Sequence, residues 1–454
     1  MIFRAVKERL GPLWWYAALM FAASRMGDVV NVVIGLWLVP LFVSTEKLGA
    51  LLPIMNFSAV YTLPLAVLLL PVPKFLNVFA SGGEGGKAKA LLRDALLVTM
   101  IYGLVMAAFV FWTGDGVLLR LKLDDRRLLW LVAGFAMLTV LTPLLGSAQQ
   151  AFKAFRSMVA GNSVLPYVRL TGMLIFLPLL GGTGWLLAQF GMGVAGLAIA
   201  GGAAWWVLRR AGRCESYREH WGEMLRFALP LALGMAAGKI QFPIESLVVR
   251  QRLPEEVSAG FFFVTMFGMI PMYFTGAVTP FLWVLVSDRF ERGERTEGLM
   301  WQSLAFNFAV GGVVTLLAVA AWLAPRFLGW WENWPWKPFD AYAGYVGMLC
   351  LMNVIRGGTA IFTAHETACR RFGFMWYTIP SSLACSALLY VIPGWGFFQP
   401  WLPRGFYEWV DARMVVSLDV FLGVMLGSSV AVLLGVAWQL WNRRMSNRDF
   451  STGI

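Results

Sequence analysis

The sequence predicts an all-α integral membrane protein that crosses the bilayer about twelve times. Hydrophobic residues make up 59% of the 454-residue chain, charged residues make up only 14%, and the mean hydropathy is +0.68. A soluble fold of this length could not bury that much apolar surface. The apolar runs are also long and apolar on every face, whereas strands of a membrane barrel are short and alternate apolar with polar residues. The spans are therefore predicted to be helices.

Twelve apolar runs are long enough to cross a hydrocarbon core roughly 30 Å thick, which takes about 20 helical residues. The predicted spans cover residues 16–43, 50–72, 91–113, 128–150, 158–180, 184–208, 225–250, 258–286, 300–325, 339–364, 372–394 and 413–441. The first run is too long for the apolar region of a cleaved signal, and no small-residue cleavage site follows it. We therefore expect it to remain as a membrane anchor.

The distribution of Lys and Arg predicts the orientation, because positive charges are enriched in cytoplasmic loops. With a cytoplasmic N-terminus, 22 of the 37 Lys and Arg residues fall on the cytoplasmic side, 11 fall outside and 4 lie within spans. Both termini are therefore expected in the cytoplasm. The same bias accounts for the net charge of +12 through contact with anionic lipid of the bilayer, so nucleic acid is not an expected partner.

A long basic loop divides the predicted spans six and six. It predicts an N-terminal lobe at residues 1–208, a cytoplasmic linker at residues 209–223 and a C-terminal lobe at residues 224–454. Shifting the chain on itself by 211 residues lays the first span on the seventh. Two related halves of this kind are common in transporters, where the substrate path lies between them.

Prolines interrupt the second predicted helix of each half. Pro64 and Pro71 lie in the first half, and Pro271 and Pro280 lie in the second. Each proline removes a backbone hydrogen bond and can kink its helix. Paired interrupted helices in corresponding places indicate a transport path. The alternative is that these prolines are tolerated in packed membrane helices without a role.

Six charged residues stand out inside the predicted spans, where a charge costs roughly 2.5–3.5 kcal/mol at a helix centre and usually faces a cavity or a partner. They are Arg25, Asp28, Arg169, Lys239, Glu245 and Arg356. Arg25 and Asp28 are three residues apart, so they share a helix face and can neutralise each other. The 211-residue shift places Lys239 opposite Asp28, which marks equivalent depths in the two lobes.

Among these six residues, four cations against two carboxylates leave a formal excess of two positive charges in the membrane interior. An anion would balance that excess, and a pyrophosphate-linked lipid would supply one through charge-assisted hydrogen bonds to Arg and Lys. These six residues are therefore candidate substrate-binding residues of a cavity. The alternative is structural: Arg169 and Arg356 would bond to backbone carbonyls or polar neighbours inside one lobe.

Four stretches of the sequence carry a resemblance to a known family. The second half opens on LRFALPLALG (225–234) after the basic loop, and AGFFFVTMFGMIP (259–271) and FLWVLVSDRFERGE (281–294) follow it. In the first half, PLFVSTEKLGALLPI (40–54) precedes the second predicted helix. With the six-and-six layout, these stretches resemble the multidrug/oligosaccharidyl-lipid/polysaccharide (MOP) superfamily of exporters, and within it the flippases of polysaccharides and lipid-linked oligosaccharides. The stretches at 259–271 and 281–294 look like that family's eighth helix and the charged loop after it, and 40–54 is similar to its outer loop before the second helix.

The resemblance implies two six-helix lobes that form a V around a central cavity opening alternately to each side. It also implies a multi-pass protein of the bacterial plasma (inner) membrane that carries a polyprenyl pyrophosphate-type glycan lipid. Candidate protein partners are a polysaccharide polymerase or a glycosyltransferase.

Two other function classes remain open. In a cation-coupled multidrug exporter of the same superfamily, Asp28 would bind the proton or sodium ion, although Arg25 one turn away weakens this hypothesis. A polytopic glycan-processing membrane enzyme would carry a large outer domain or loop, which the predicted outer loops do not provide. No cofactor is expected because no phosphate-binding G-x-x-x-x-G-K-[ST] loop occurs, and no metal site is expected because the two histidines and four cysteines lack ligand spacing.

Overall fold

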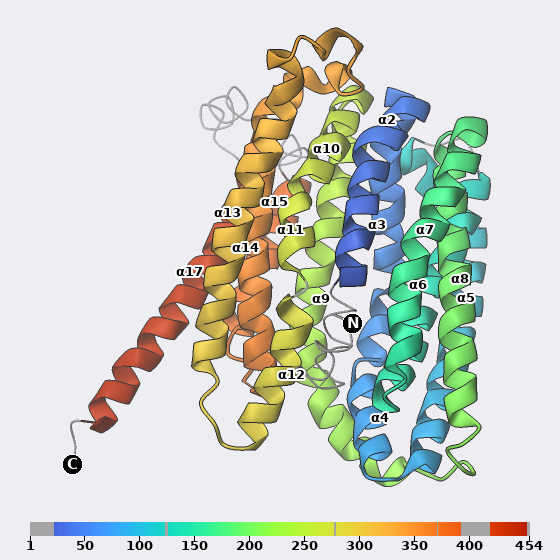
Figure 1. Ribbon diagram of the computed structural model, residues 1–454, viewed down its shortest axis with the longest axis vertical. Helices are drawn as coiled ribbons and strands as arrows, with labels where there is room; N and C mark the ends of the chain where they lie inside the picture. Colours follow the sequence, from blue (N-terminus) through green and yellow to red (C-terminus); the bar gives the residue numbers. More distant parts are fainter. Residues whose placement is uncertain (1–21, 123–125, 277, 370, 392–417, 452–454) are drawn as a thin grey trace, which may run out of the picture. The chain divides into compact units, whose positions relative to one another are not determined.

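The computed structural model describes residues 22–122, 126–276, 278–369, 371–391 and 418–451. Within these ranges the chain is helical without strands, and ten helices are long and apolar enough to cross a membrane (Figure 1). The two remaining predicted spans, 225–250 and 372–394, correspond to α9 (Trp221–Arg252) and α15 (Met375–Val391). The predicted all-α membrane class is confirmed.

The chain divides into two compact units, Met1–Ala232 and Leu233–Ile454. The division falls in the first half of α9, shortly after the predicted linker. Because a bilayer core offers no water to backbone groups, each unit is assembled from helices whose hydrogen bonds close within the segment.

Unit 1 begins with the span Ala22–Phe42, which contains a π-helical segment, η1 (Ile34–Leu38), and ends in α2 (Val39–Phe42). The helices that follow are α3 (Thr45–Leu68), α4 (Pro71–Ser81), α5 (Gly85–Leu121), α6 (Arg126–Ala151), α7 (Phe155–Leu180) and α8 (Gly182–Leu208). Helices α7 and α8 form a tight hairpin, and α8 also packs on α6 (Figure 1). Buried residues of α4, α5, α6 and α8, among them Phe75, Phe79 and Leu92, form one core cluster.

Unit 2 contains most of α9 and seven further helices within the described residues. They are α10 (Glu255–Gly268), α11 (Ile270–Thr275), α12 (Val278–Glu291), α13 (Glu297–Phe327), α14 (Ala343–Ala368), α15 and α17 (Leu418–Ser451). At one end an aromatic cluster joins α10, α13 and the loop before α14, where Trp322 stacks on Trp336 at 5.8 Å between ring centroids. Phe267 meets both indole rings edge-on, so this loop is packed into the unit.

The second predicted span of the first half is broken close to its prolines. Helix α3 ends at Leu68, and α4 begins at Pro71, which occupies the first turn, where a missing N–H leaves no hydrogen bond unmade. Pro64 lies inside α3, one turn before its end. The result is a break between two helices rather than one continuous rod.

The span predicted at 258–286 is three helices rather than one. Helix α10 ends at Gly268, the short α11 carries Pro271 in its first turn, and α12 carries Pro280 in its first turn. The breaks lie next to the two prolines that the sequence analysis expects to interrupt this span, because each proline withholds the N–H that would continue the preceding helix. Residue 277, between α11 and α12, lies outside the described residues.

The segment predicted as the linker is fastened to unit 1. The backbone N–H of Glu215 donates to the carbonyl of Gly86 at 3.2 Å, and Lys89 Nζ donates to the carbonyl of Gly212 at 3.2 Å. Lys87 Nζ lies 2.7 Å from Glu219 Oε1, and this hydrogen bond lowers the pKa of the Glu219 carboxyl below its ordinary value. The segment 212–219, which we call the strap, therefore packs along the start of α5.

A close approach between α7 and α8 gives a test of this fold. A Cβ at Gly184 would overlap the backbone carbonyl of Phe176, whereas a Cβ at Gly191, two turns along the same helix, would meet no atom within 4 Å. We expect Gly184→Ala to destabilise the detergent-solubilised protein by about 1–3 kcal/mol, the usual cost of overpacking. Gly191→Ala should leave the melting temperature unchanged or slightly raised, and equal melting of the two variants would contradict the close approach.

Candidate functional site

The first polar cluster of unit 1 lies on the first span. Arg25 Nη2 lies 2.8 Å from Asp28 Oδ2, and both side chains are about one-fifth exposed. The pair is spaced i,i+3, so one helix turn brings the groups together, as the sequence analysis expects. Six residues after Asp28, η1 replaces regular α-helix, and π-helical turns of this kind are frequent at functional sites.

Arg169 of α7 joins the first span to α8. Its guanidinium donates to the side-chain oxygen of Asn31. With the Gln189 amide oriented so that its oxygen faces the guanidinium, that oxygen accepts from Nε at 3.1 Å and from Nη2 at 2.6 Å. Amide oxygens satisfy guanidinium N–H groups without cancelling their charge. Hydrogen bonds to two side-chain amides therefore hold the Arg169 guanidinium in this corner of unit 1.

A small residue explains why Asn31 and Arg169 can meet. A Cβ on Gly27 would lie 2.8 Å from Pro166 Cγ, so only glycine allows the first span to approach α7 this closely. Gly27 and Asn31 are four residues apart on one helix, and Pro166 and Arg169 are three apart on the other. These spacings put the packing contact and the hydrogen bond on the same two helix faces.

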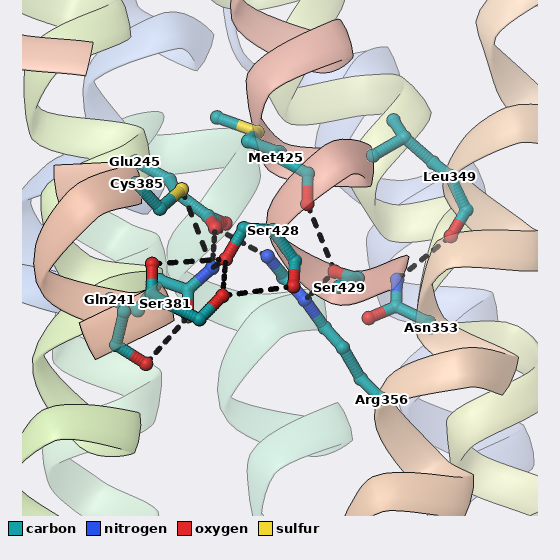
Figure 2. Close-up of polar contacts among 11 residues, drawn as sticks. Gln241, Glu245, Leu349, Asn353, Arg356, Ser381, Cys385, Met425, Ser428 and Ser429 are labelled. Atoms are coloured by element: carbon teal, nitrogen blue, oxygen red, sulfur yellow. Dashed lines mark hydrogen bonds and ion pairs between the residues drawn. The ribbon is translucent and has the colours of Figure 1, made fainter. Parts of the chain in front are cut away.

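The corresponding polar cluster of unit 2 centres on a buried ion pair between α9 and α14 (Figure 2). Glu245 is 1% exposed, and its Oε1 accepts from Arg356 Nη2. Arg356 Nε also donates to Ser429 Oγ of α17 at 3.3 Å. Removing one partner of a buried ion pair leaves the other charge without compensation, which is costly.

Neutral polar side chains complete this cluster on the carboxylate side (Figure 2). Gln241, one turn before Glu245 on α9, donates from Nε2 to Glu245 Oε1 at 3.0 Å. Its Oε1 accepts from Ser382 of α15 at 3.1 Å, and Ser381 donates to the carbonyl of Ser428 on α17 at 3.1 Å. Four helices, α9, α14, α15 and α17, are thus joined through polar contacts at one level.

The formal charges of the six candidate residues divide evenly between the units. Unit 1 holds Arg25, Asp28 and Arg169, which sum to one positive charge. In unit 2 the Glu245–Arg356 pair sums to zero, and Lys239 adds one positive charge. Lys239 belongs to α9, but its side chain falls outside the described residues. The structure thus gathers Arg25 with Asp28 and Glu245 with Arg356, and it places Arg169 among amides.

A third buried polar group lies at the end of α14 and was not singled out by the sequence. His365 and Glu366 are 1% and 0% exposed, with His365 Nδ1 3.2 Å from Glu366 Oε1. His365 Nε2 lies 3.0 Å from Thr296 Oγ1 at the start of α13, and Gln439 of α17 donates to Glu366 at 3.4 Å. These contacts fasten α14 to its neighbours at the end opposite the aromatic cluster.

Comparison with known proteins defines the class of fold. No family model and no curated protein matches the sequence. Among solved structures, the chain has the fold of MOP superfamily transporters, with similarity over nearly its whole length.

One similar structure is a multidrug resistance MATE family transporter of that superfamily in an inward-facing conformation, with a TM-score of 0.64 and 16% identity, covering 96% of this chain and 100% of that one. A second is a MOP superfamily transporter from Pyrococcus furiosus, described by a binding pocket of reversed polarity (TM-score 0.62, 13% identity, 96% and 97% covered). A third is the lipid II flippase MurJ in an inward closed conformation (TM-score 0.60, 12% identity, 94% and 87% covered). These likenesses establish the fold.

The Glu245–Arg356 pair gives a stability prediction. We expect Arg356→Met to lower the unfolding free energy by about 3–5 kcal/mol, because Glu245 would be left buried without its counter-ion. The double variant Glu245→Leu/Arg356→Met should recover most of that loss, since it removes both charges. Thermal unfolding in detergent of the two single variants and the double variant measures the coupling.

The matched control is the exposed pair of Lys337 with Glu332 in the same unit. Lys337→Ala should change stability by less than about 1 kcal/mol, because exposed ion pairs are screened by water and salt. Additive losses in the Glu245/Arg356 cycle would show that the two charges do not depend on each other.

Proposed function

We propose that the protein is a membrane transporter that flips an anionic lipid-linked oligosaccharide or polysaccharide precursor from the cytoplasmic to the outer leaflet by alternating access. The shared fold of MOP superfamily transporters supports the general class. A flippase of a lipid-linked precursor, the lipid II flippase MurJ, is among the similar structures. Transport by two alternating lobes needs no bond to be broken in the substrate, so no enzymatic step is part of the proposal.

The observation that carries the substrate class is the surplus of positive charge among residues inside the spans. Among the six candidate residues, one formal positive charge remains in each unit after the carboxylates are counted. In unit 1 the Arg169 guanidinium is hydrogen-bonded to two side-chain amides, and the Arg25 side chain, which pairs with Asp28, is one-fifth exposed. A pyrophosphate group between lipid and sugar would offer the oxygen acceptors that Arg and Lys bind best.

The membrane potential would drive export of such an anionic headgroup. An anionic headgroup with about two charges that leaves a negative interior gains roughly 4–5 kcal/mol per 100 mV of membrane potential, at about 2.3 kcal/mol per charge. In this proposal the protein lies in a bacterial plasma (inner) membrane, with both termini on the negative, cytoplasmic side. The proposed protein partners are a glycosyltransferase, which would act before the transport step, or a polysaccharide polymerase, which would act after it.

The charge argument predicts that Arg25→Ala and Lys239→Ala each abolish export of lipid-linked sugar while membrane insertion and folding stay intact. Each substitution removes one of the cations proposed to bind the pyrophosphate. Export is measured as the appearance of the labelled precursor in the outer leaflet of proteoliposomes or cells. The matched control is Arg213→Ala, which removes an exposed cation of the strap and should export normally. Normal export by both test variants would end the anionic-cavity hypothesis.

A cation-coupled multidrug exporter is the second candidate function. The multidrug resistance MATE family transporter among the similar structures supports it, as does a carboxylate, Asp28, placed in the first span. Two contacts weigh against it: Arg25 lies 2.8 Å from Asp28, and the Glu245 carboxylate is occupied by Arg356. An acid that is already neutralised by an internal cation binds a proton or sodium ion less readily.

This second candidate predicts that Asp28→Asn removes proton- or sodium-dependent efflux of a cationic dye. The reason is that the amide carries no negative charge and does not titrate near neutral pH. Dye efflux from cells or proteoliposomes is the measurement, and Asn31→Asp on the same helix serves as a variant that adds a carboxylate instead. Absence of dye efflux from the unmodified protein would contradict the hypothesis of a multidrug exporter.

A further inference from the structure

A cavity of about 490 Å³ opens between the start of α7 and the end of α8 in unit 1. Its lining residues are Lys153, Ala154, Arg156, Ser157, Gly202, Ala203 and Trp206. The two small residues of α8 and the indole of Trp206 give the cavity an apolar wall, while the residues before and at the start of α7 give it a cationic rim. The polar cluster around Arg169 lies on the same two helices, nearer the middle of the unit.

Three cations converge on this cavity. Lys153 and Arg156 line it directly and have exposed side chains. Arg210 stacks its guanidinium on the Trp206 ring, 3.8 Å from the ring centroid, so its charge is held at the cavity wall. The adjacent Arg209 stacks on Trp205 instead, 5.8 Å from the ring centroid. Neither Arg209 nor Trp205 lines the cavity.

The backbone adds to the positive potential at the rim. Helix α7 begins at Phe155 after the N-cap Ala154, whose side chain offers no acceptor to the first turn. The positive end of a 26-residue helix therefore points toward the same place as Lys153 and Arg156. Lys153 itself has a φ of 58°, an uncommon conformation for a residue with a side chain, which fixes the turn between α6 and α7.

A phospholipid matches this combination of features better than a free anion does. The cavity lies at the ends of membrane-spanning helices, where Trp205 and Trp206 are more than half exposed, as is typical of residues at a lipid–water interface. Cations at the rim suit a phosphodiester, and the apolar wall suits the first carbons of acyl chains. Basic pockets between helix ends are known places for anionic headgroups.

We propose that this cavity binds one anionic phospholipid, with its phosphodiester at Lys153, Arg156 and Arg210 and its acyl chains against Gly202, Ala203 and Trp206. The charge-based orientation puts these residues at the cytoplasmic leaflet. The lipid would brace the α7–α8 hairpin at the end opposite its tight turn. The site is separate from the residues proposed to bind the transported substrate.

The test compares two variants that lose the same charge. The site variant is Lys153→Gln/Arg156→Gln/Arg210→Gln, and the control variant is Arg209→Gln/Arg213→Gln/Arg218→Gln, which removes three exposed cations outside the cavity. Purified protein in neutral detergent is titrated with short-chain phosphatidylglycerol, and retained lipid is counted by native mass spectrometry. We expect one tightly retained lipid for the unmodified protein and the control, and at least about tenfold weaker retention for the site variant.

A second pair keeps every charge and changes only the wall. Trp206→Leu should weaken phosphatidylglycerol retention because Arg210 loses its stacking surface, whereas Trp205→Leu should not. An unchanged melting temperature in each variant shows that the loss is local, and the Trp pair serves if the triple site variant does not fold.

Three results would overturn the proposal. Equal retention by the site and control variants would mean that general charge, not the cavity, attracts the lipid. Equal retention of phosphatidylcholine would mean that the anionic headgroup is not recognised. Displacement by millimolar inorganic phosphate, or preference for undecaprenyl phosphate over phosphatidylglycerol, would assign the cavity to a free anion or to a polyprenyl carrier.

Discussion

The hydrocarbon core of a bilayer offers no hydrogen bonds, and this constraint governs where each polar group of the chain can lie. The two units meet it in different ways. In unit 1, Arg169 spreads its guanidinium over two neutral amides. In unit 2, Arg356 is matched by a carboxylate, Glu245; Gln241 donates to that carboxylate, and Ser429 accepts from the guanidinium. The first arrangement uses neutral acceptors, and the second uses a carboxylate.

The helical membrane class and most of the spans could be predicted because about 20 consecutive apolar residues leave few alternatives. The span at 258–286 shows where such reasoning fails. Its apolar composition is continuous, but Pro271 and Pro280 each open a new helix, so hydropathy alone joins three segments into one. The contacts between the strap and α5 could not be predicted either, since the partners on α5 lie more than 120 residues earlier in the chain.

The charged candidates could be found from the sequence because charges inside apolar runs are rare, and the i,i+3 pairing of Arg25 with Asp28 follows from helix geometry alone. The pairing of Glu245 with Arg356 could not, because 111 residues separate them. Asn31, Gln189 and Gln241 were missed for a different reason: a search for charges passes over neutral amides, although these amides decide how a buried cation is held.

Arg356 gives Glu245 a counter-ion that is part of the same chain. A counter-ion drawn from solution must be present at sufficient concentration, and its occupancy follows the salt on either side of the membrane. A tethered guanidinium has a fixed effective concentration, because meeting its partner is an intramolecular event. The neutrality of this part of unit 2 is therefore set when the chain folds, and it does not vary with the ionic composition of the two compartments.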